Sequence, residues 1–351
     1  MTTVTLARRS PSTHSCEVSV RELARESWDD VVRSFADHTI FHTLGWLEAL
    51  SAARGLRVIL LVAEIEDRPV AAWPFLLWRC GPLRFLGSPL PATGTVYLGP
   101  LIRPEVEVPP VLRAFLAHGS LQRYTYLGCR VLDRSRAVDL EPFGFARTRS
   151  FDTYCIDLRR TEKQLWDGLR SECRSRIRKA LKLGVEIQRE ESLDFLDDFW
   201  TMTRETFRRT HGRPTHSRKL VTELWKRLWP QGRLEVLSAR FEGKRIATLV
   251  LPFDASAMYY WAGASFDRHR AVPAGNLLHW EAIRGALRRG LCSYDLDSIA
   301  GSPGRFKRSF GAEVVRTATH WEHIPSRMLT SVKRLLERAV RRLAKGNQGQ
   351  K

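Results

Sequence analysis

The stretch Leu234-Glu-Val-Leu-Ser-Ala-Arg-Phe-Glu-Gly-Lys-Arg-Ile-Ala-Thr-Leu-Val-Leu-Pro-Phe253 decides the fold. Its two apolar runs, separated at Gly243-Lys244, predict a strand, a tight turn and a second strand. An earlier stretch, Arg57-Val-Ile-Leu-Leu-Val-Ala-Glu-Ile-Glu-Asp-Arg-Pro-Val-Ala-Ala-Trp-Pro-Phe75, has the same pattern and predicts a turn at Asp67-Arg68. Three identical residues recur at a constant offset of 176, namely Ala63, Glu66 and Ala71 against Ala239, Glu242 and Ala247. The chain therefore contains an internal repeat built around a β-hairpin.

Helical patterns precede each hairpin, and a strand, a helix and another strand follow it. Apolar side chains recur at helical spacing in residues 20–35 and 41–50 before the first hairpin and in residues 196–207 before the second. The later helices and strands are predicted at residues 111–121, 124–127, 277–289 and 294–297. This order predicts an α/β (α+β) fold of two tandem units, each a mixed, mainly antiparallel sheet flanked by helices. The predicted divisions are a flexible N-terminus at 1–15, domains at 16–155 and 156–325, and a basic amphipathic C-terminal helix and tail at 326–351.

The net charge of +19 restricts the classes of partner. A strong positive field favours nucleic acid, anionic lipid or phosphorylated substrates. Arginine supplies 47 of the 57 basic residues, which is also what a GC-rich genome produces, so a solvated basic surface is an equal alternative.

Six scattered cysteines without a Cys-x-x-Cys pair argue against a disulfide framework and a zinc site. His211 and His216 match no standard zinc motif and are expected in a surface loop near the substrate.

The order of elements resembles the GNAT acyltransferase fold, and its doubling resembles the Fem-like (FemAB) and BioF2-like acyltransferases over roughly residues 30–315. The stretches that carry the resemblance are Phe41–Trp46, Arg174–Val185, Tyr259–Ala264, Asn276–Trp280 and Arg305–Gly311. The resemblance implies an enzyme that transfers an activated acyl group to an amine, with no resident cofactor and no metal. It also implies that two strands part in the second domain and offer backbone N–H groups to the acyl carbonyl.

The loop Phe266-Asp-Arg-His-Arg-Ala-Val-Pro-Ala-Gly-Asn276 precedes a predicted helix, whose N-terminus attracts anions. In GNAT enzymes this loop holds the pyrophosphate of coenzyme A. The resemblance therefore implies donor binding by Arg268, Arg270, Gly275 and Asn276. Pro273 stands where the family has a glycine, and proline has no N–H to give to a phosphate. An ordinary arginine-containing loop is the alternative.

The segment Leu169–Gly184 has six basic residues among sixteen and predicts a helix with Ile177 and Ala180 on its buried face. Guanidinium groups suit phosphate oxygens, and in the resembling families basic residues here are associated with a phosphorylated acceptor. The expected acceptor- and phosphate-binding residues are Arg174, Arg178, Lys179 and Phe306. A basic, solvent-facing helix is the alternative.

The stretch Asp295-Leu-Asp-Ser-Ile-Ala-Gly-Ser-Pro-Gly-Arg-Phe-Lys-Arg-Ser-Phe-Gly311 supplies the predicted catalytic residues. Asp295 and Asp297 alternate on a strand, so they are expected on one face, where either could deprotonate the amine or pair with a neighbouring arginine. A short helix is predicted after Ser302-Pro303, anchored by two phenylalanines. In Fem-like enzymes the lysine of the Phe-Lys pair is linked to charge stabilisation, which implies this role for Lys307.

The resemblance to Fem-like enzymes implies transfer of an aminoacyl group from aminoacyl-tRNA to an amine of a small metabolite or a lipid-linked or other cell-envelope precursor, and the net charge and Pro273 favour this donor. One alternative is an acyl-CoA-dependent N-acetyltransferase in polysaccharide or metabolite biosynthesis. Another is a non-catalytic module that binds tRNA or a membrane.

No apolar run approaches the ~18–20 residues of a membrane span, so a cytoplasmic protein is expected. Residues 326–345 could add peripheral contact with the inner membrane face or dock on the fold.

Overall fold

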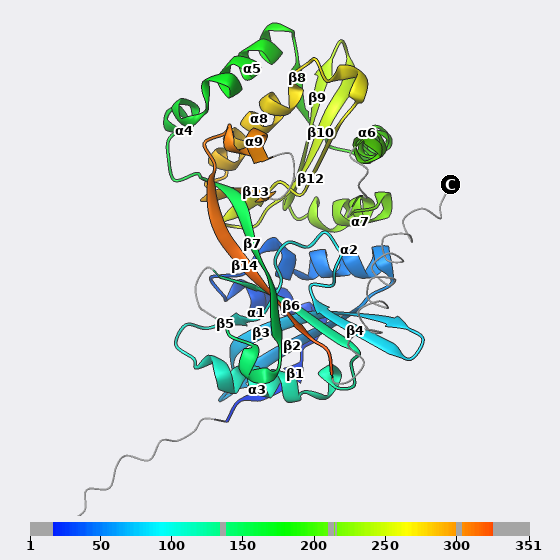
Figure 1. Ribbon diagram of the computed structural model, residues 1–351, viewed down its shortest axis with the longest axis vertical. Coiled ribbons are helices and arrows are strands. Elements are labelled where there is room, and N and C mark those ends of the chain that lie inside the picture. Colours follow the sequence, from blue (N-terminus) through cyan, green and yellow to red (C-terminus); the bar gives the residue numbers. More distant parts are fainter. Residues whose placement is uncertain (1–16, 134–137, 210–213, 215, 300–303, 326–351) are drawn as a thin grey trace, which may run out of the picture.

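Two lobes make up the part of the chain that this computed structural model describes, residues 17–133, 138–209, 214, 216–299 and 304–325 (Figure 1). The segments predicted at 1–15 and 326–351 lie outside these residues. The N-terminal unit contains β1 (Ser19–Glu22), α1 (Arg25–Arg33), η1 (Ile40–His42), α2 (Leu44–Arg54), β2 (Arg57–Ile65), β3 (Arg68–Cys80), β4 (Leu83–Ser88), β5 (Leu101–Ile102), α3 (Val108–Ala117), η2 (Gly119–Leu121), β6 (Tyr126–Leu132) and η3 (Glu141–Phe143). The strand β7 (Ala146–Asp157) leads out of it.

The C-terminal unit begins after β7 and ends before the last strand. It contains α4 (Glu162–Gly168), α5 (Ser171–Lys182), β8 (Glu186–Arg189), η4 (Leu193–Phe195), α6 (Leu196–Arg209), α7 (Arg218–Leu228), β9 (Leu234–Phe241), β10 (Lys244–Pro252), β11 (Ala257–Tyr259), β12 (Ala262–Ser265), η5 (Asp267–His269), α8 (Ala274–Arg288), β13 (Ser293–Ser298) and α9 (Gly304–Arg308). The strand β14 (Glu313–His323) then returns to the N-terminal unit.

Two sheets run through the molecule, and the larger one joins both units. Its strand order is β1-β2-β3-β4-β6-β14-β7-β13-β11, with β5 paired to β3, and the smaller sheet has the order β12-β10-β9-β8. Mixed sheets flanked by helices confirm the predicted fold class. The long strands β7 and β14 cross together from one lobe to the other (Figure 1). The predicted boundary at residue 155 falls on β7, which pairs with both β14 and β13, so the sheet is continuous across it.

The internal repeat is visible in the register of the two hairpins. Ala63 pairs with Ala71, and Ala239 pairs with Ala247, so both pairs keep the offset of 176. The register shift that follows each pair occurs at the equivalent place, next to Val70 in one hairpin and next to Ile246 in the other. The residues with positive φ in the turns are Glu66, Asp67, Glu242 and Gly243. Each turn therefore lies one residue before its predicted position.

One predicted helix is wrong at its start. Residues 20–35 were expected to form a single helix, but Ser19–Glu22 is the strand β1, and α1 begins at Arg25. Val20 pairs with Ala63 on the edge of β2. Pairing with an available strand edge supplies backbone hydrogen bonds that a short isolated helix cannot supply as well. The predicted helices at 41–50, 111–121, 196–207 and 277–289 are confirmed within a few residues as α2, α3, α6 and α8.

An apolar core holds the two units together. One buried cluster contains Trp46 and Tyr97 from the N-terminal unit and Phe199, Leu224 and Tyr259 from the C-terminal unit. Helix α2 packs against α7, and the two helices lie at the junction of the lobes (Figure 1). Burial of apolar surface stabilises a protein by roughly 25 cal/mol per Å². Since side chains of both units are buried in one cluster, this stabilisation holds the N-terminal unit in place against the strands of the C-terminal unit.

Candidate functional site

The strands β12 and β13 part in the C-terminal unit. β11 pairs in parallel with β13, and the Tyr260 amide still donates to the Asp295 carbonyl at 2.8 Å. Beyond Trp261 the chain enters β12, which pairs with β10 in the other sheet, whereas β13 continues beside β7. The parted strands predicted from the resemblance are therefore present, and we call the opening between β12 and β13 the split. Its role in holding an acyl carbonyl stays a prediction.

Lys307 lies on α9 and points inward. Only 5% of the residue is exposed, and its Nζ donates to the Ser298 carbonyl at 2.9 Å. Nζ lies 5.9 Å from the centre of the Tyr260 ring. Burial lowers the pKa of Lys307, while the charges of Asp297 and Asp295 act in the opposite direction. The structure thus brings the predicted lysine and both predicted carboxylates together beside the split.

The turn that follows the helix of Lys307 packs against the end of α4 at Gly311. This glycine has φ +73°, and a Cβ atom there would lie 2.8 Å from the Gly168 carbonyl oxygen. Phe310, buried at the end of the same segment, packs 5.1 Å from Phe306, centre to centre. These contacts confirm that Phe310 anchors the segment, with Phe306 half-buried against it. Ser302 and Pro303, predicted to begin the helix, lie outside the described residues.

Gly311→Ala should reduce the free energy of unfolding by about 2 kcal/mol, because alanine disfavours this φ and its methyl group meets backbone. The matched control is Gly290→Ala, where φ is +70° but nothing lies within 4 Å of the added Cβ. It should lose only about 1 kcal/mol. Chemical denaturation measures both variants. Equal losses would show that the approach to Gly168 does not constrain the segment.

The two aspartates differ in geometry, so their expected placement on one regular strand face is wrong. Asp295 is 2% exposed and accepts a hydrogen bond from the Tyr97 hydroxyl at 2.5 Å. Its other oxygen accepts from the Asp297 amide at 2.8 Å. Asp297 has φ +66°, and the register of β13 on β7 shifts between Asp295 and Ser298. This bulge interrupts the strand alternation and turns Asp297 out of the regular strand.

Tyr260 is a residue of the split to which the sequence assigned no role. Burial and the charge of Asp297 raise its pKa to about 12, so it keeps its proton at neutral pH. A Cβ at Gly263 would meet the Tyr260 ring at 2.7 Å, so the glycine gives the ring its space. The signal that pointed to this residue was the run Tyr259-Tyr-Trp-Ala-Gly-Ala264, which carried the resemblance without a role for each member.

Residues 266–276, which we call the donor loop after their predicted role, lead to the N-terminus of α8 as predicted, but the side chains expected to bind the donor do not all converge. Arg270 is exposed, whereas Arg268 lies over the Phe266 ring at 4.2 Å and bonds to His269. Asn276 is 4% exposed, and its amide donates to the Cys173 sulfur at 3.4 Å. The Asn276 side chain therefore contacts α5 through this hydrogen bond. Gly275 faces the Phe306 ring, 3.8 Å from its added Cβ.

Two of the basic residues of α5 predicted to bind phosphate, Arg174 and Arg178, contact other groups of the protein. The Arg174 guanidinium donates to the carbonyls of Asp167 at 2.9 Å and of Leu169, and so covers the end of α4. Arg178 lies over the Trp166 ring at 5.6 Å, and Lys179 is exposed. Burial of Ile177 and Ala180 confirms the predicted helix face. Phosphate binding by these residues stays a prediction.

Arg305 pairs with an acidic residue of α5. Its guanidinium lies 4.0 Å from the carboxylate of Glu172, on α5. The alternative to a catalytic role was that one of the two aspartates pairs with Arg305 or Arg308; Asp295 accepts a hydrogen bond from Tyr97, a residue of the N-terminal unit.

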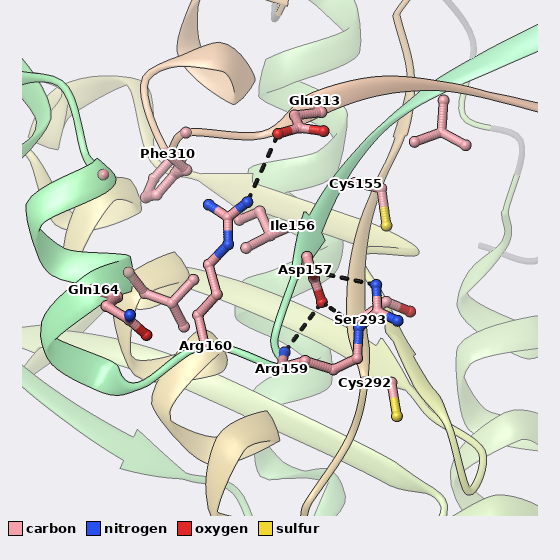
Figure 2. A pocket seen from close by; sticks show the side chains of 14 residues that line it. Cys155, Ile156, Asp157, Arg159, Arg160, Gln164, Cys292, Ser293, Phe310 and Glu313 are labelled. Atoms are coloured by element: carbon pink, nitrogen blue, oxygen red, sulfur yellow. Dashed lines mark hydrogen bonds and ion pairs between the residues drawn. The ribbon is translucent and has the colours of Figure 1, made fainter.

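A cavity of about 240 Å³ lies between α4, β7 and β14 (Figure 2), and its lining residues do not include Lys307 or the two aspartates. Its charged residues pair with one another: Arg159 with Asp157 at 2.8 Å and Arg160 with Glu313 at 3.8 Å. The remaining wall includes Ile156, Leu165 and Phe310. Because these charges compensate one another, the cavity offers no unpaired charge to a substrate.

The histidine prediction needs a correction where the structure describes it. His216 is 6% exposed and stacks on Phe199, with ring centres 5.9 Å apart, so it does not lie in a surface loop. Burial lowers its pKa to about 4 and keeps it neutral. His211 lies outside the described residues. Across the described ranges, no group of three or more His, Cys, Asp or Glu side chains could hold a metal ion.

None of the helices in the described part of the chain has the length and apolar character needed to cross a membrane.

The C-terminal unit is similar to a known protein family. Residues 168–308 match the family model described as an acetyltransferase (GNAT) domain. No curated protein matches the chain. The matched residues contain the split, the donor loop, both aspartates and Lys307. Residues 168–308 therefore resemble a GNAT domain, and the expectation of an acyltransferase is confirmed.

Solved structures extend the likeness to both units. The crystal structure of FemX superposes with a TM-score of 0.74 at 13% identity, covering 90% of this chain and 99% of that one. A tandem GNAT protein from the clavulanic acid biosynthesis pathway, solved without acetyl-CoA, has a TM-score of 0.55 at 15% identity and covers 89% and 100%. At such identities the likeness shows the tandem fold alone. The BioF2-like type stays a prediction.

Proposed function

We propose that this chain is an N-acyltransferase that moves an aminoacyl group from aminoacyl-tRNA to the amine of a small metabolite or a cell-envelope precursor. The observation that carries the proposal is the split between β12 and β13, bordered by Lys307, Asp297 and Tyr260. A cation, a carboxylate and a protonated phenol at one opening are the groups that amide formation from an ester requires.

Lys307 stabilises charge in this reaction, and Asp297 and Tyr260 transfer protons. The amine nitrogen attacks the ester carbonyl, and the ammonium of Lys307 stabilises the negative charge that forms on the carbonyl oxygen. Asp297 accepts the proton that the amine loses. The new C–N bond remains when the C–O bond to the ribose oxygen of the tRNA breaks. Tyr260 donates its proton to that oxygen and recovers it from Asp297, so protons balance over one turnover.

The N-terminus of α8 favours tRNA over coenzyme A as the donor. Pro273, the residue that precedes the helix, has no N–H, and the Ala274 amide already donates to the Val272 carbonyl at 2.8 Å. The bond from Asn276 to Cys173 uses only the side-chain amide, so it removes a polar side chain from the site but no backbone N–H. A pyrophosphate binds to several backbone N–H groups at such a site, and the loss of two of them at Pro273 and Ala274 weakens the acyl-CoA alternative. The net charge of +19 supports a polyanionic donor.

Arg270→Gln should change donor affinity less than threefold, because an exposed arginine adds at most one of several phosphate contacts to tRNA. Filter binding of aminoacyl-tRNA at 50 and 200 mM salt measures this, and wild-type affinity should fall at least tenfold over that range. Titration calorimetry with coenzyme A is the parallel measurement. Tight coenzyme A binding that is lost in Arg270→Gln would establish the acyl-CoA alternative instead.

The direct test supplies radiolabelled aminoacyl-tRNA and acetyl-CoA separately with a panel of amines, and follows the label into a product stable to alkali. Transfer from aminoacyl-tRNA supports the proposal. Transfer from neither donor would overturn the proposed reaction, and retained tRNA binding in that case would identify a binding module.

A further inference from the structure

A loop of the N-terminal unit holds both sides of the split. The Trp261 indole, between β11 and β12, donates to the Gly94 carbonyl at 2.7 Å. Three residues later in the same loop, the Tyr97 hydroxyl donates to Asp295 on β13. One bond therefore reaches the residue that precedes β12, and the other reaches β13, so both sides of the split are contacted. Residues 94–98, which we call the clamp loop, connect those strands from outside the domain that contains them.

The clamp loop is itself fixed to the N-terminal unit. Arg130 donates to the carbonyls of Thr95 at 3.1 Å and Val96 at 2.8 Å. Leu98 forms an antiparallel bridge with Arg130, and the Trp46 indole donates to the Thr95 hydroxyl at 3.0 Å. Each neighbour of Tyr97 is thus bound to a strand or helix of that unit, so the position of the Tyr97 hydroxyl is set by the fold.

Gly94 shows how close this contact is. Its φ is +71°, and a Cβ there would lie 3.2 Å from the Trp261 Nε1 atom. A larger residue would be strained in its backbone and would press on the indole that donates to it. Tyr97 has no exposed surface, so its bond to Asp295 is shielded from water.

Asp295 passes this restraint to Asp297. One carboxylate oxygen accepts from Tyr97, and the other accepts from the Asp297 amide. The amide belongs to a residue with left-handed backbone, a conformation that non-glycine residues hold only where their surroundings impose it. The bond from Asp295 is one such contact, because it fixes the peptide that enters the left-handed turn.

We infer that the clamp loop is a positioning device for the transfer site: through Tyr97 and Asp295 it holds the turn that presents Asp297, and through Gly94 and Trp261 it sets the width of the split. The inference rests on the proposed function for its consequence in transfer. It gives the N-terminal unit a role in the chemistry of the C-terminal unit. It also separates the two aspartates, since Asp297 contacts the reacting atoms and Asp295 acts through it.

Tyr97→Phe tests the inference, with Tyr259→Phe as its matched control. Tyr259 is also a buried tyrosine that donates to an aspartate, Asp254, at 2.9 Å, and it packs 6.2 Å from Tyr97 in the same core. Both variants lose one buried hydroxyl, so both should lower Tm to a similar extent. Only Tyr97→Phe should lower kcat, by tenfold or more, with KM for the donor within twofold of wild type.

A second measurement needs no transfer activity. The pKa of Lys307 is followed by NMR in protein labelled with 13C at lysine Cε, with the signal assigned by its loss in Lys307→Arg. Asp297→Asn should lower this pKa, because the carboxylate that raises it is gone. Tyr97→Phe should lower it in the same direction, because Asp297 is no longer held beside Lys307, and Tyr259→Phe should leave it unchanged.

The two measurements separate the inference from the proposed function. A Lys307 pKa that falls in Asp297→Asn but stays at the wild-type value in Tyr97→Phe would overturn the inference. A pKa that is unchanged in both variants would overturn it too, because Asp297 would then not lie beside Lys307. If wild-type protein transfers no acyl group, the proposed function fails, and the titration still decides whether the clamp loop holds Asp297.

Discussion

Lys307→Met should lower kcat for acyl transfer by about 10²- to 10³-fold, the loss that follows removal of one group that stabilises developing charge. Methionine has a similar length and accepts burial, so the fold should be kept. Lys307 is 5% exposed and is directed to Ser298 and the Tyr260 ring, which places its charge at the split and away from solvent. Steady-state kinetics at saturating donor measures the change.

The matched control is Arg308→Met, the next residue on α9, which is exposed. It removes the same charge from the same helix, and kcat should stay within threefold of wild type. Circular dichroism and Tm confirm that both variants fold. Equal kcat in Lys307→Met and wild type would remove Lys307 from the mechanism.

The pH dependence of kcat gives an independent check on this residue. Burial lowers the pKa of Lys307 below that of an exposed lysine. If the charged form is needed, activity is present below that pKa and is lost as the pH rises through it, earlier than for an ordinary lysine near 10.4. In Asp297→Asn the alkaline limb should move to still lower pH, because the carboxylate that stabilises the ammonium is removed.

The helices and strands of this fold were predicted well from local sequence patterns, because they depend on interactions between residues close in sequence or on the internal repeat. The alanine pairs of the two hairpins sit in the same register, as the offset of 176 required. The two phenylalanines predicted to anchor the segment of Lys307, at positions i and i+4, do pack on each other. The sequence likewise located the donor loop before α8.

Features set by distant contacts were not predictable in this way. Tyr97 and Asp295 are 198 residues apart, and nothing near either residue indicates the other. The left-handed turn at Asp297 breaks the alternation on which the prediction of a shared face depended. Arg174 was assigned to a phosphate from its charge, but its position next to the end of α4 supplies carbonyl partners. The insertion of β14 between β6 and β7 had no counterpart in the repeat pattern.

Asp297→Asn should lower transfer by about 10²- to 10⁴-fold, the range for removal of a general base. Asparagine is nearly isosteric and tolerates left-handed backbone, so Tm should change little. Its amide cannot accept the proton of the attacking amine. The measured quantity is kcat at the pH optimum of the wild-type protein. A variant that keeps wild-type turnover would show that another group accepts the proton.

Asp297→Gly separates the strain at this position from its chemistry. Glycine adopts φ +66° without cost, so the variant should gain up to about 1 kcal/mol in free energy of unfolding while losing transfer as completely as Asp297→Asn. Glu242→Gly is the matched control, because Glu242 has φ +52° in an exposed turn away from the split. It should gain similar stability and keep full activity.

A chain that is more stable without Asp297 but inactive would mean that the left-handed turn is kept for transfer although it lowers the stability of the fold. Loss of stability in Asp297→Gly would instead show that the carboxylate is a structural partner of Lys307.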